Sequence, residues 1–378
     1  MLALLLLLQA ASPDIVVTGQ RLVEEQAKCA RGECTPLRDA QATIALAEQR
    51  FRNGEYVQAK GLLAAAISRN KDKGAEAPRA VAAIYEAMAT VSLHEGDQDD
   101  YRRAVAGQVK TLRDNLPADD VAVQASATAL GDMWIKLGRY RQAESTFRGI
   151  EEQALAEGQA YPAMMAGMKR VWLAGALGKA REASAMLDAL EQRSIAQEPA
   201  FRTALRVVRL RLAVRAGDDA EITRLAGTIG TDQGGPPVLI WQPSYPGSAA
   251  AEANNSARTF DLVDAVPINS SDLASIQWVD VGFWIRPDGH TEEAEILRGS
   301  RSPAWAPAIL KQVAGRRYAA RAKVGEEDAS GSYRIERVTP KYQYVVPKGS
   351  VIRRRVPAAG FEILDLTASE AAMPPPGE

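Results

Sequence analysis

The pattern Asn53-Gly54-Glu55-Tyr56-Val57-Gln58-Ala59 returns at Leu137-Gly138-Arg139-Tyr140-Arg141-Gln142-Ala143, with glycine, tyrosine and alanine in the same places. A glycine in similar surroundings recurs at intervals of 39 to 42 residues, at Gly54, Gly96, Gly138, Gly178 and Gly217. Because a left-handed backbone costs glycine little, we expect each glycine to lie in a turn between two helices. The residue five positions later should face the partner helix, and the residue nine positions later should fill the core.

The repeated stretch resembles the tetratricopeptide repeat, in which a G-x-Y-x-x-A centre joins two antiparallel helices. The intervals are longer than the repeat's usual length of about 34 residues. The resemblance implies an α-solenoid of about five helix pairs over residues 37–230, with a concave surface that binds protein partners. The alternative is that these helices only position a neighbouring domain.

The composition argues against several classes of function. Lys and Arg number 46 and Asp and Glu number 47, so no excess of positive charge indicates a nucleic-acid partner. The only histidines are His94 and His290, and there are two cysteines, which speaks against a multi-histidine metal centre or an iron–sulfur cluster. We find no nucleophile–base pair and no phosphate loop. The sequence therefore predicts a protein that is not an enzyme, without catalytic, cofactor-binding or metal-binding residues.

The N-terminal residues 1–12 resemble an export signal. Residues Met1 to Leu8 are almost all leucine, a run far shorter than the ~20 residues that span a membrane. Ala10, Ala11 and Ser12 supply the small side chains of a cleavage site. We therefore expect a chain without a transmembrane helix, exported to the periplasm of a Gram-negative cell envelope. The alternative is an apolar N-terminus on a cytoplasmic protein.

The leader at residues 13–36 contains both cysteines. Cys29 and Cys34 are separated by Ala-Arg-Gly-Glu, which can close a small disulfide loop. In an oxidising compartment we expect the two cysteines to pair, whereas in the cytoplasm they would remain free thiols. The disulfide and the export prediction therefore depend on each other.

The composition changes after Gly230. A linker rich in glycine and proline is expected at residues 231–272, and a second domain at residues 273–347. In that domain alternating apolar residues predict a hairpin around the turn 286–290, then a helix over 303–313 capped by Ser302, then a strand over 332–346. The tail at 348–378 should add a strand between 351 and 367 before a disordered end.

This order of strand, strand, helix and strand resembles the C-terminal domain of the TonB energy transducer, over about 110 residues from Pro237 to Val346. The matching segments are Gln242–Pro246, Val281–Gly289, Ala294–Leu297 and Trp305–Leu310. The expected fold is thus an α + (α+β) chain, a solenoid followed by a small domain of antiparallel sheet and helix. A cap that only stabilises the repeats is the alternative function of this domain.

The TonB resemblance implies contact with outer-membrane TonB-dependent receptors, whose short N-terminal box adds as a strand. The residues matching the receiving segments are Gln242, Tyr245, Tyr333, Ile335, Tyr342 and Tyr344. The chain also carries a segment similar to such a box, at Ile15, Val16, Val17 and Thr18. We expect that this segment can add to the C-terminal sheet, within one molecule or between two, which would produce self-association.

Overall fold

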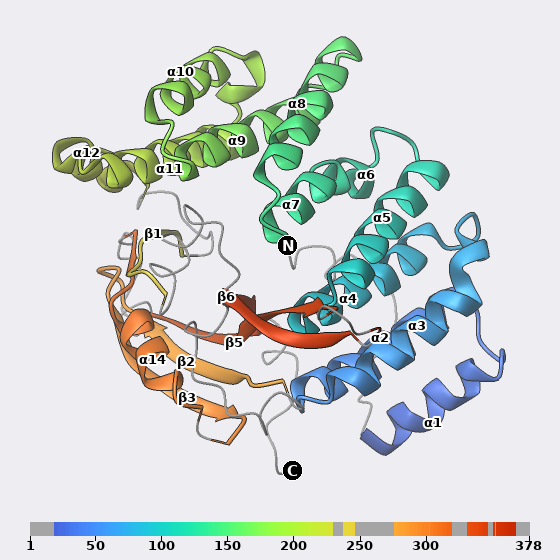
Figure 1. Ribbon diagram of the computed structural model, residues 1–378. Helices are drawn as coiled ribbons and strands as arrows, with labels where there is room; N and C mark the ends of the chain where they lie inside the picture. The colour runs from blue at the N-terminus through green and yellow to red at the C-terminus, as the bar shows by residue number, and fades with distance from the viewer. Residues whose placement is uncertain are drawn as a thin grey trace. The chain divides into compact units, whose positions relative to one another are not determined.

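The computed structural model describes residues 19–229, 237–245, 276–301, 303–319, 331–346, 351 and 353–367. The chain forms two compact units (Figure 1). The first unit contains Met1–Leu137, Leu273–Ile276 and Tyr342–Val356, and the second contains Gly138–Asp272, Gln277–Lys341 and Pro357–Glu378. Among the described residues, no helix is both long and apolar enough to cross a membrane. The expected signal peptide and the box-like segment Ile15–Thr18 lie outside the described residues.

Helices make up most of both units. Those of the first unit are α1 (Gly19–Ala30), α2 (Pro36–Arg52), α3 (Tyr56–Asn70), α4 (Pro78–Glu95), α5 (Gln98–Asn115), α6 (Val121–Ser126) and α7 (Ala129–Lys136). Those of the second unit are α8 (Tyr140–Ala156), α9 (Ala160–Ala176), α10 (Ala180–Glu191), α11 (Pro199–Ala216), α12 (Asp219–Ile229) and α14 (Ala306–Ala314). Short 3-10 helices lie at Lys71–Lys73 and Ser194–Gln197. The helical region begins earlier than expected, because α1 lies inside the predicted leader.

The recurring glycines occupy the turns between consecutive helices, as the repeat pattern predicts. All five have positive φ, between 68° and 85°, which is the left-handed conformation that favours glycine. Five residues further on, Ala59, Ala143 and Ala183 are completely buried. Nine residues further on, Leu63, Phe147 and Leu187 are completely buried as well. The repeat pattern therefore identified both the turns and the positions at which neighbouring helices pack.

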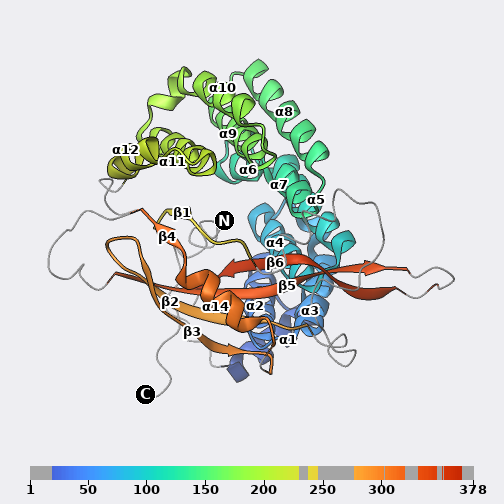
Figure 2. The same ribbon diagram turned by 60° about the vertical axis from the view of Figure 1, so that its left-hand side comes forward.

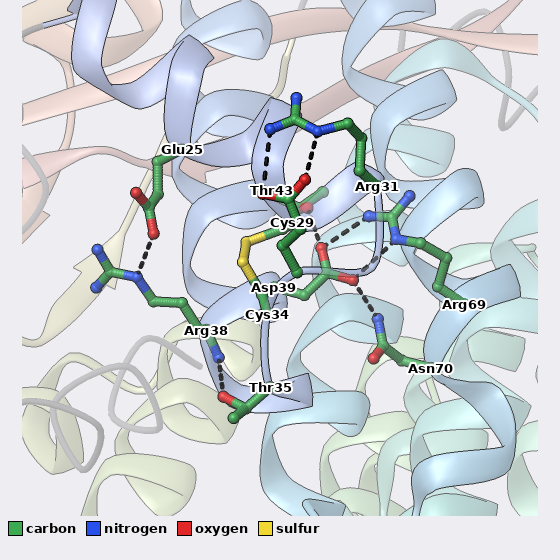
Figure 3. Close-up of a disulfide and its surroundings, with 11 residues drawn as sticks. Glu25, Cys29, Arg31, Cys34, Thr35, Arg38, Asp39, Thr43, Arg69 and Asn70 are labelled. Atoms are coloured by element: carbon green, nitrogen blue, oxygen red, sulfur yellow. Dashed lines mark hydrogen bonds and ion pairs between the residues drawn. A yellow bond between two sulfur atoms is a disulfide. The ribbon is translucent and has the colours of Figure 1, made fainter.

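A disulfide joins Cys29, in the last turn of α1, to Cys34, just before α2 (Figure 3). The start of α2 is fixed by Thr35, whose hydroxyl accepts a hydrogen bond from the amide of Arg38. The side chain of Arg38 returns to α1 through an ion pair of 2.7 Å with Glu25. Helix α1 is therefore held on α2 by one covalent bond and one partly exposed ion pair.

A buried carboxylate joins α2 to α3. Asp39 accepts hydrogen bonds from Thr43 on its own helix and from Arg69 and Asn70 on α3, at 2.6 to 3.0 Å (Figure 3). Burial alone would raise the pKa of Asp39, but the hydrogen bonds from Arg69, Asn70 and Thr43 outweigh it and hold that pKa below its ordinary value. The side chain is therefore ionised, and α2 and α3 share a charge-assisted network.

Replacing both cysteines with serine should loosen α1. The disulfide closes a small loop between residues five positions apart. A disulfide that closes a loop of this size stabilises the folded state by about 2 kcal/mol, because it lowers the entropy of the unfolded chain. Hydrogen exchange of amides in α1, measured by mass spectrometry, should accelerate in Cys29→Ser/Cys34→Ser and in the reduced parent chain. The reductant should change nothing in the double variant, and equal protection of α1 in all samples would contradict the prediction.

Strands form two antiparallel arrangements. They are β1 (Leu239–Trp241), β2 (Val279–Ile285), β3 (Thr291–Gly299), β4 (Arg317–Tyr318), β5 (Ser332–Val345) and β6 (Arg354–Asp365). A four-stranded sheet has the order β3-β2-β5-β6, and β1 pairs with β4. Strand β2 contributes the buried side chains of Val279, Val281, Phe283 and Ile285, which pack with Ile309 and Val313 of α14. Figure 2 shows α14 alongside β2 and β3.

Most elements of the second domain appear where the sequence places them, with three differences. Helix α14 begins at Ala306 instead of Pro303, with Trp305 at its N-cap and Pro307 in its first turn, where a missing N–H costs nothing. Strand β1 lies inside the region expected to be a linker. Strand β5, expected to offer a free edge, has β2 on one side and β6 on the other.

Candidate partner-binding surfaces

The segment Gln242–Tyr245 is fixed to the end of α14 in the second unit. The side-chain amide of Gln312 donates to the carbonyl of Pro243 at 3.1 Å and to the side-chain oxygen of Gln242 at 3.3 Å. Gly315 leaves room for the ring of Pro243, since a Cβ at this glycine would lie 2.6 Å from it. Gln242 is exposed, and its side-chain oxygen accepts one hydrogen bond from Gln312.

Tyr245 is held by a buried arginine. The guanidinium of Arg316 donates to the Tyr245 hydroxyl at 3.1 Å, forms an ion pair with Glu336 at 2.8 Å and donates to Gln312 at 3.2 Å. Burial lowers the pKa of Arg316, but the nearby Glu336 carboxylate more than compensates and raises it overall. Burial also raises the pKa of Tyr245, so its hydroxyl remains protonated. We call this group of Gln312, Arg316, Tyr245 and Glu336 the Arg316 clamp.

Tyr333 and Ile335 lie in the middle of the sheet. The amide of Ile335 donates to the Thr367 hydroxyl, and its carbonyl accepts from the amide of Leu366 at 2.8 Å. The ring of Tyr333 packs against that of Trp284 at 5.1 Å between centroids. Over Ser332–Val338 strand β5 pairs with β2, and β6 is its other neighbour, so a partner strand cannot add to this part of β5 without displacing β2 or β6. The part of the expected receiving strand that contains Tyr333 and Ile335 is therefore enclosed.

Tyr342 and Tyr344 fall in the first unit. Tyr342 is buried, and its backbone lies against the α4–α5 turn at Gly96. The hydroxyl of Tyr344 donates to Glu95 at 3.3 Å. Gln242, Tyr245, Tyr333 and Ile335 belong to the second unit.

Strand β3 is an outer strand of the sheet, and it is not among the contact residues that the sequence predicts. Its residues Ile296 and Leu297 are 40% and 41% exposed although both are apolar and adjacent in the chain. Glu292, Glu293 and Glu295 line the same strand and are exposed. Two consecutive apolar residues in an otherwise acidic strand were the signal that could have identified it. Of the described strands in this sheet, β3 and β6 each have a single neighbour.

A buried ion pair lies within the sheet, where sequence patterning gave no indication of one. Asp280 of β2 and Arg337 of β5 are both completely buried, and the guanidinium donates to both carboxylate oxygens at 2.7 and 2.9 Å. Arg298 of β3 adds a third hydrogen bond to Asp280 at 2.6 Å. The Arg337 guanidinium lies 3.8 Å from the ring centroid of Trp278. The three strands are therefore joined by charge as well as by their backbones.

Comparisons with known proteins give distant likenesses of fold. No family model and no curated protein matches the chain. A kinesin light chain of Podosopora anserina with nearly identical TPR-like repeats is 15% identical and covers 60% of this chain and 99% of its own, with a TM-score of 0.37. BtubC (BKLC) from P. vanneervenii is 17% identical, covers 62% of this chain and 95% of its own, and has a TM-score of 0.39.

A Rap protein solved in complex with a competence and sporulation factor is a third neighbour. It is 14% identical and covers 56% of this chain and 58% of its own, with a TM-score of 0.37. TPR-like repeat proteins are thus among the neighbours of this mostly helical chain.

Proposed function

We propose that this chain is an exported adaptor without enzymatic activity, which binds protein partners through its helical repeats and through a module similar to the TonB C-terminal domain. TonB-dependent receptors of the outer membrane are the proposed class of partner. The observation that supports the module best is the Arg316 clamp. It holds the Gln-Pro-Ser-Tyr segment on α14, as a fixed part of a strand–strand–helix–strand unit.

The proposed contact for a receptor segment is the outer edge of β3. Backbone groups on an outer strand are available for strand addition, and an enclosed strand offers none. Ile296 and Leu297 supply exposed apolar surface at this edge. This proposal moves the contact away from the part of β5 at Ser332–Val338, which has β2 and β6 as neighbours.

Export to the periplasm is part of the same proposal. It is supported by the leucine-rich start of the sequence and by the pairing of Cys29 with Cys34. Disulfides persist in oxidising compartments and are rare in the cytoplasm of mesophiles.

A second candidate function is that the sheet region only caps the repeats. One observation favours it, namely the packing of Val238 and Ile240, around β1, against α11 and α12. The contact includes Leu210, Leu225 and Ala319, all of them buried. Such a cap would cover the apolar surface of the last helices and would need no partner.

A box peptide distinguishes these two functions. A fluorescent peptide with the sequence of residues 14–21, Asp-Ile-Val-Val-Thr-Gly-Gln-Arg, should bind the chain from which residues 1–21 have been removed. Because two exposed apolar side chains contribute to the edge, Ile296→Lys/Leu297→Lys should weaken binding by about tenfold or more.

Val57→Lys is the matched control, since Val57 is 70% exposed on α3 and belongs to the first unit. It should leave the affinity of the peptide unchanged. Fluorescence anisotropy of the labelled peptide measures its affinity for both variants. No binding by the parent chain, or equal binding by both variants, would favour the cap.

A further inference from the structure

The α4–α5 turn of the first unit differs from the other repeat turns. A Cβ placed on Gly96 would lie 2.5 Å from the Cβ of Tyr342 and 2.7 Å from its backbone carbon and oxygen. At Gly138, Gly178 and Gly217 the same test finds no atom within 4 Å. All four glycines share the left-handed conformation. Among them, only Gly96 also lies in contact with the backbone of another segment.

The turn beneath Tyr342 is strongly acidic. Lys60 of α3 forms ion pairs with Glu95, Asp97 and Asp100 at 2.6 to 2.9 Å, so one ammonium group serves three carboxylates. Burial lowers the pKa of Lys60, but the hydrogen bonds to these carboxylates raise it overall and keep the group charged. Asp97 also caps α5 by accepting from the amides of residues 99 and 100. Arg102 pairs with Asp99 at 2.6 Å and Arg103 pairs with Asp100, so Lys60 and two arginines face four carboxylates, and one negative charge remains.

The segment that covers this turn carries tyrosines and arginines. The Tyr344 hydroxyl donates to Glu95, and Arg353 pairs with Asp99 at 3.3 Å. The guanidinium of Arg353 lies 5.1 Å from the Tyr344 ring centroid, and that of Arg355 lies 5.2 Å from the Tyr342 ring centroid. All of these residues belong to the first unit. The turn thus accepts this segment in three ways. Gly96 leaves room for the Tyr342 backbone, Glu95 accepts the Tyr344 hydroxyl, and Asp99 pairs with Arg353.

We propose that the α4–α5 turn is a binding site for an extended peptide that carries tyrosine and arginine side chains, and that Tyr342, Tyr344, Arg353 and Arg355 occupy it in the free chain. A partner strand of the same chemistry binds by displacing them. The site is formed by Gly96, which admits the backbone, by Glu95, which accepts from a tyrosine hydroxyl, and by Asp99, which pairs with an arginine. It goes beyond the proposed sheet-edge contact and uses none of its residues.

A labelled peptide with the sequence of residues 341–356 tests the site in the full chain. In Tyr344→Phe/Arg353→Gln the chain's own segment loses a hydrogen bond and an ion pair, so the peptide should bind this opened chain about tenfold more tightly than the parent. A peptide with glutamate in place of Arg353 and Arg355 should not bind. Failure of the first peptide to bind the opened chain, or equal binding to the opened and parent chains, would overturn the proposal.

Two matched pairs of variants locate the site. Gly96→Ala and Gly178→Ala place the same strained alanine in a repeat turn, but only the first meets another backbone, so only Gly96→Ala should abolish binding to the opened chain. Asp99→Asn should weaken binding, and Asp114→Asn on the same helix should not. Circular dichroism verifies that the helices remain folded.

If Gly96→Ala unfolds, the Asp99 and Asp114 variants decide the question alone, and equal affinity in the two would overturn the proposal. Ile296→Lys/Leu297→Lys should leave binding of this peptide unchanged. Failure of the sheet-edge proposal is therefore distinguishable from failure of this one.

Discussion

Arg337→Leu should destabilise the second unit by about 3–5 kcal/mol, the usual cost of removing one partner from a buried ion pair. Asp280 and Arg337 are completely buried, and the guanidinium supplies two of the three hydrogen bonds that Asp280 receives from arginine side chains. Without the Arg337 guanidinium the buried Asp280 carboxylate keeps its hydrogen bond from Arg298 but loses the two from Arg337. The packing of Arg337 over Trp278 is lost as well.

Hydrogen exchange of amides in β2 and β5, measured by mass spectrometry, should accelerate in this variant, because these strands open more often when the unit is less stable. Arg224→Leu is the matched control in the same unit, because Arg224 forms an exposed ion pair with Glu221, and water and salt screen such pairs so that they contribute little to stability. The double variant Asp280→Leu/Arg337→Leu should recover much of the loss, since no charge remains buried without a partner. Equal exchange in Arg337→Leu and Arg224→Leu would contradict this account.

The contrast between the repeat glycines and this ion pair shows what the sequence can predict. Gly54 and its equivalents could be found because the left-handed turn depends on the backbone of one residue, and the repetition makes the signal visible. The pairing of Asp280 with Arg337 spans 57 positions along the chain. No local pattern encodes it, because a charged residue in a strand equally suggests a face exposed to water.

The candidate surfaces were only partly predictable for the same reason. The strands over 332–346 and in the C-terminal tail were expected from local alternation, and the structure has both. Whether β5 lies at an edge depends on where β6 pairs, and that is decided by long-range packing. Tyr342 and Tyr344 were identified as contact residues, but the sequence did not indicate that Gly96 and Glu95 of the same chain would meet them.

Arg316→Met should release the segment Gln242–Tyr245 from α14 and destabilise the second unit by about 2–4 kcal/mol. The methionine fills part of the space but leaves Glu336 without its cation and Tyr245 without its donor. The guanidinium of Arg316 also lies 5.4 Å from the ring centroid of Phe283 in β2, so the substitution should weaken the packing of this strand as well. Hydrogen exchange of residues 239–245 should increase more than that of β3, because the Thr291 hydroxyl of β3 donates to the backbone carbonyl of Arg316, which methionine retains.

The neighbouring Arg317→Met is the matched control, since the exposed guanidinium of Arg317 bonds only to the carbonyls of Gly315 and Arg316 in the described structure. Tyr245→Phe separates the two effects of the clamp, because it removes one hydroxyl and should cost about 1 kcal/mol while leaving the Arg316–Glu336 ion pair in place. If Arg316→Met and Arg317→Met exposed residues 239–245 equally, the segment would be held by its backbone and by Gln312. In that case the ion pair would stabilise only the sheet, and the Gln-Pro-Ser-Tyr segment could be altered without loss of the module.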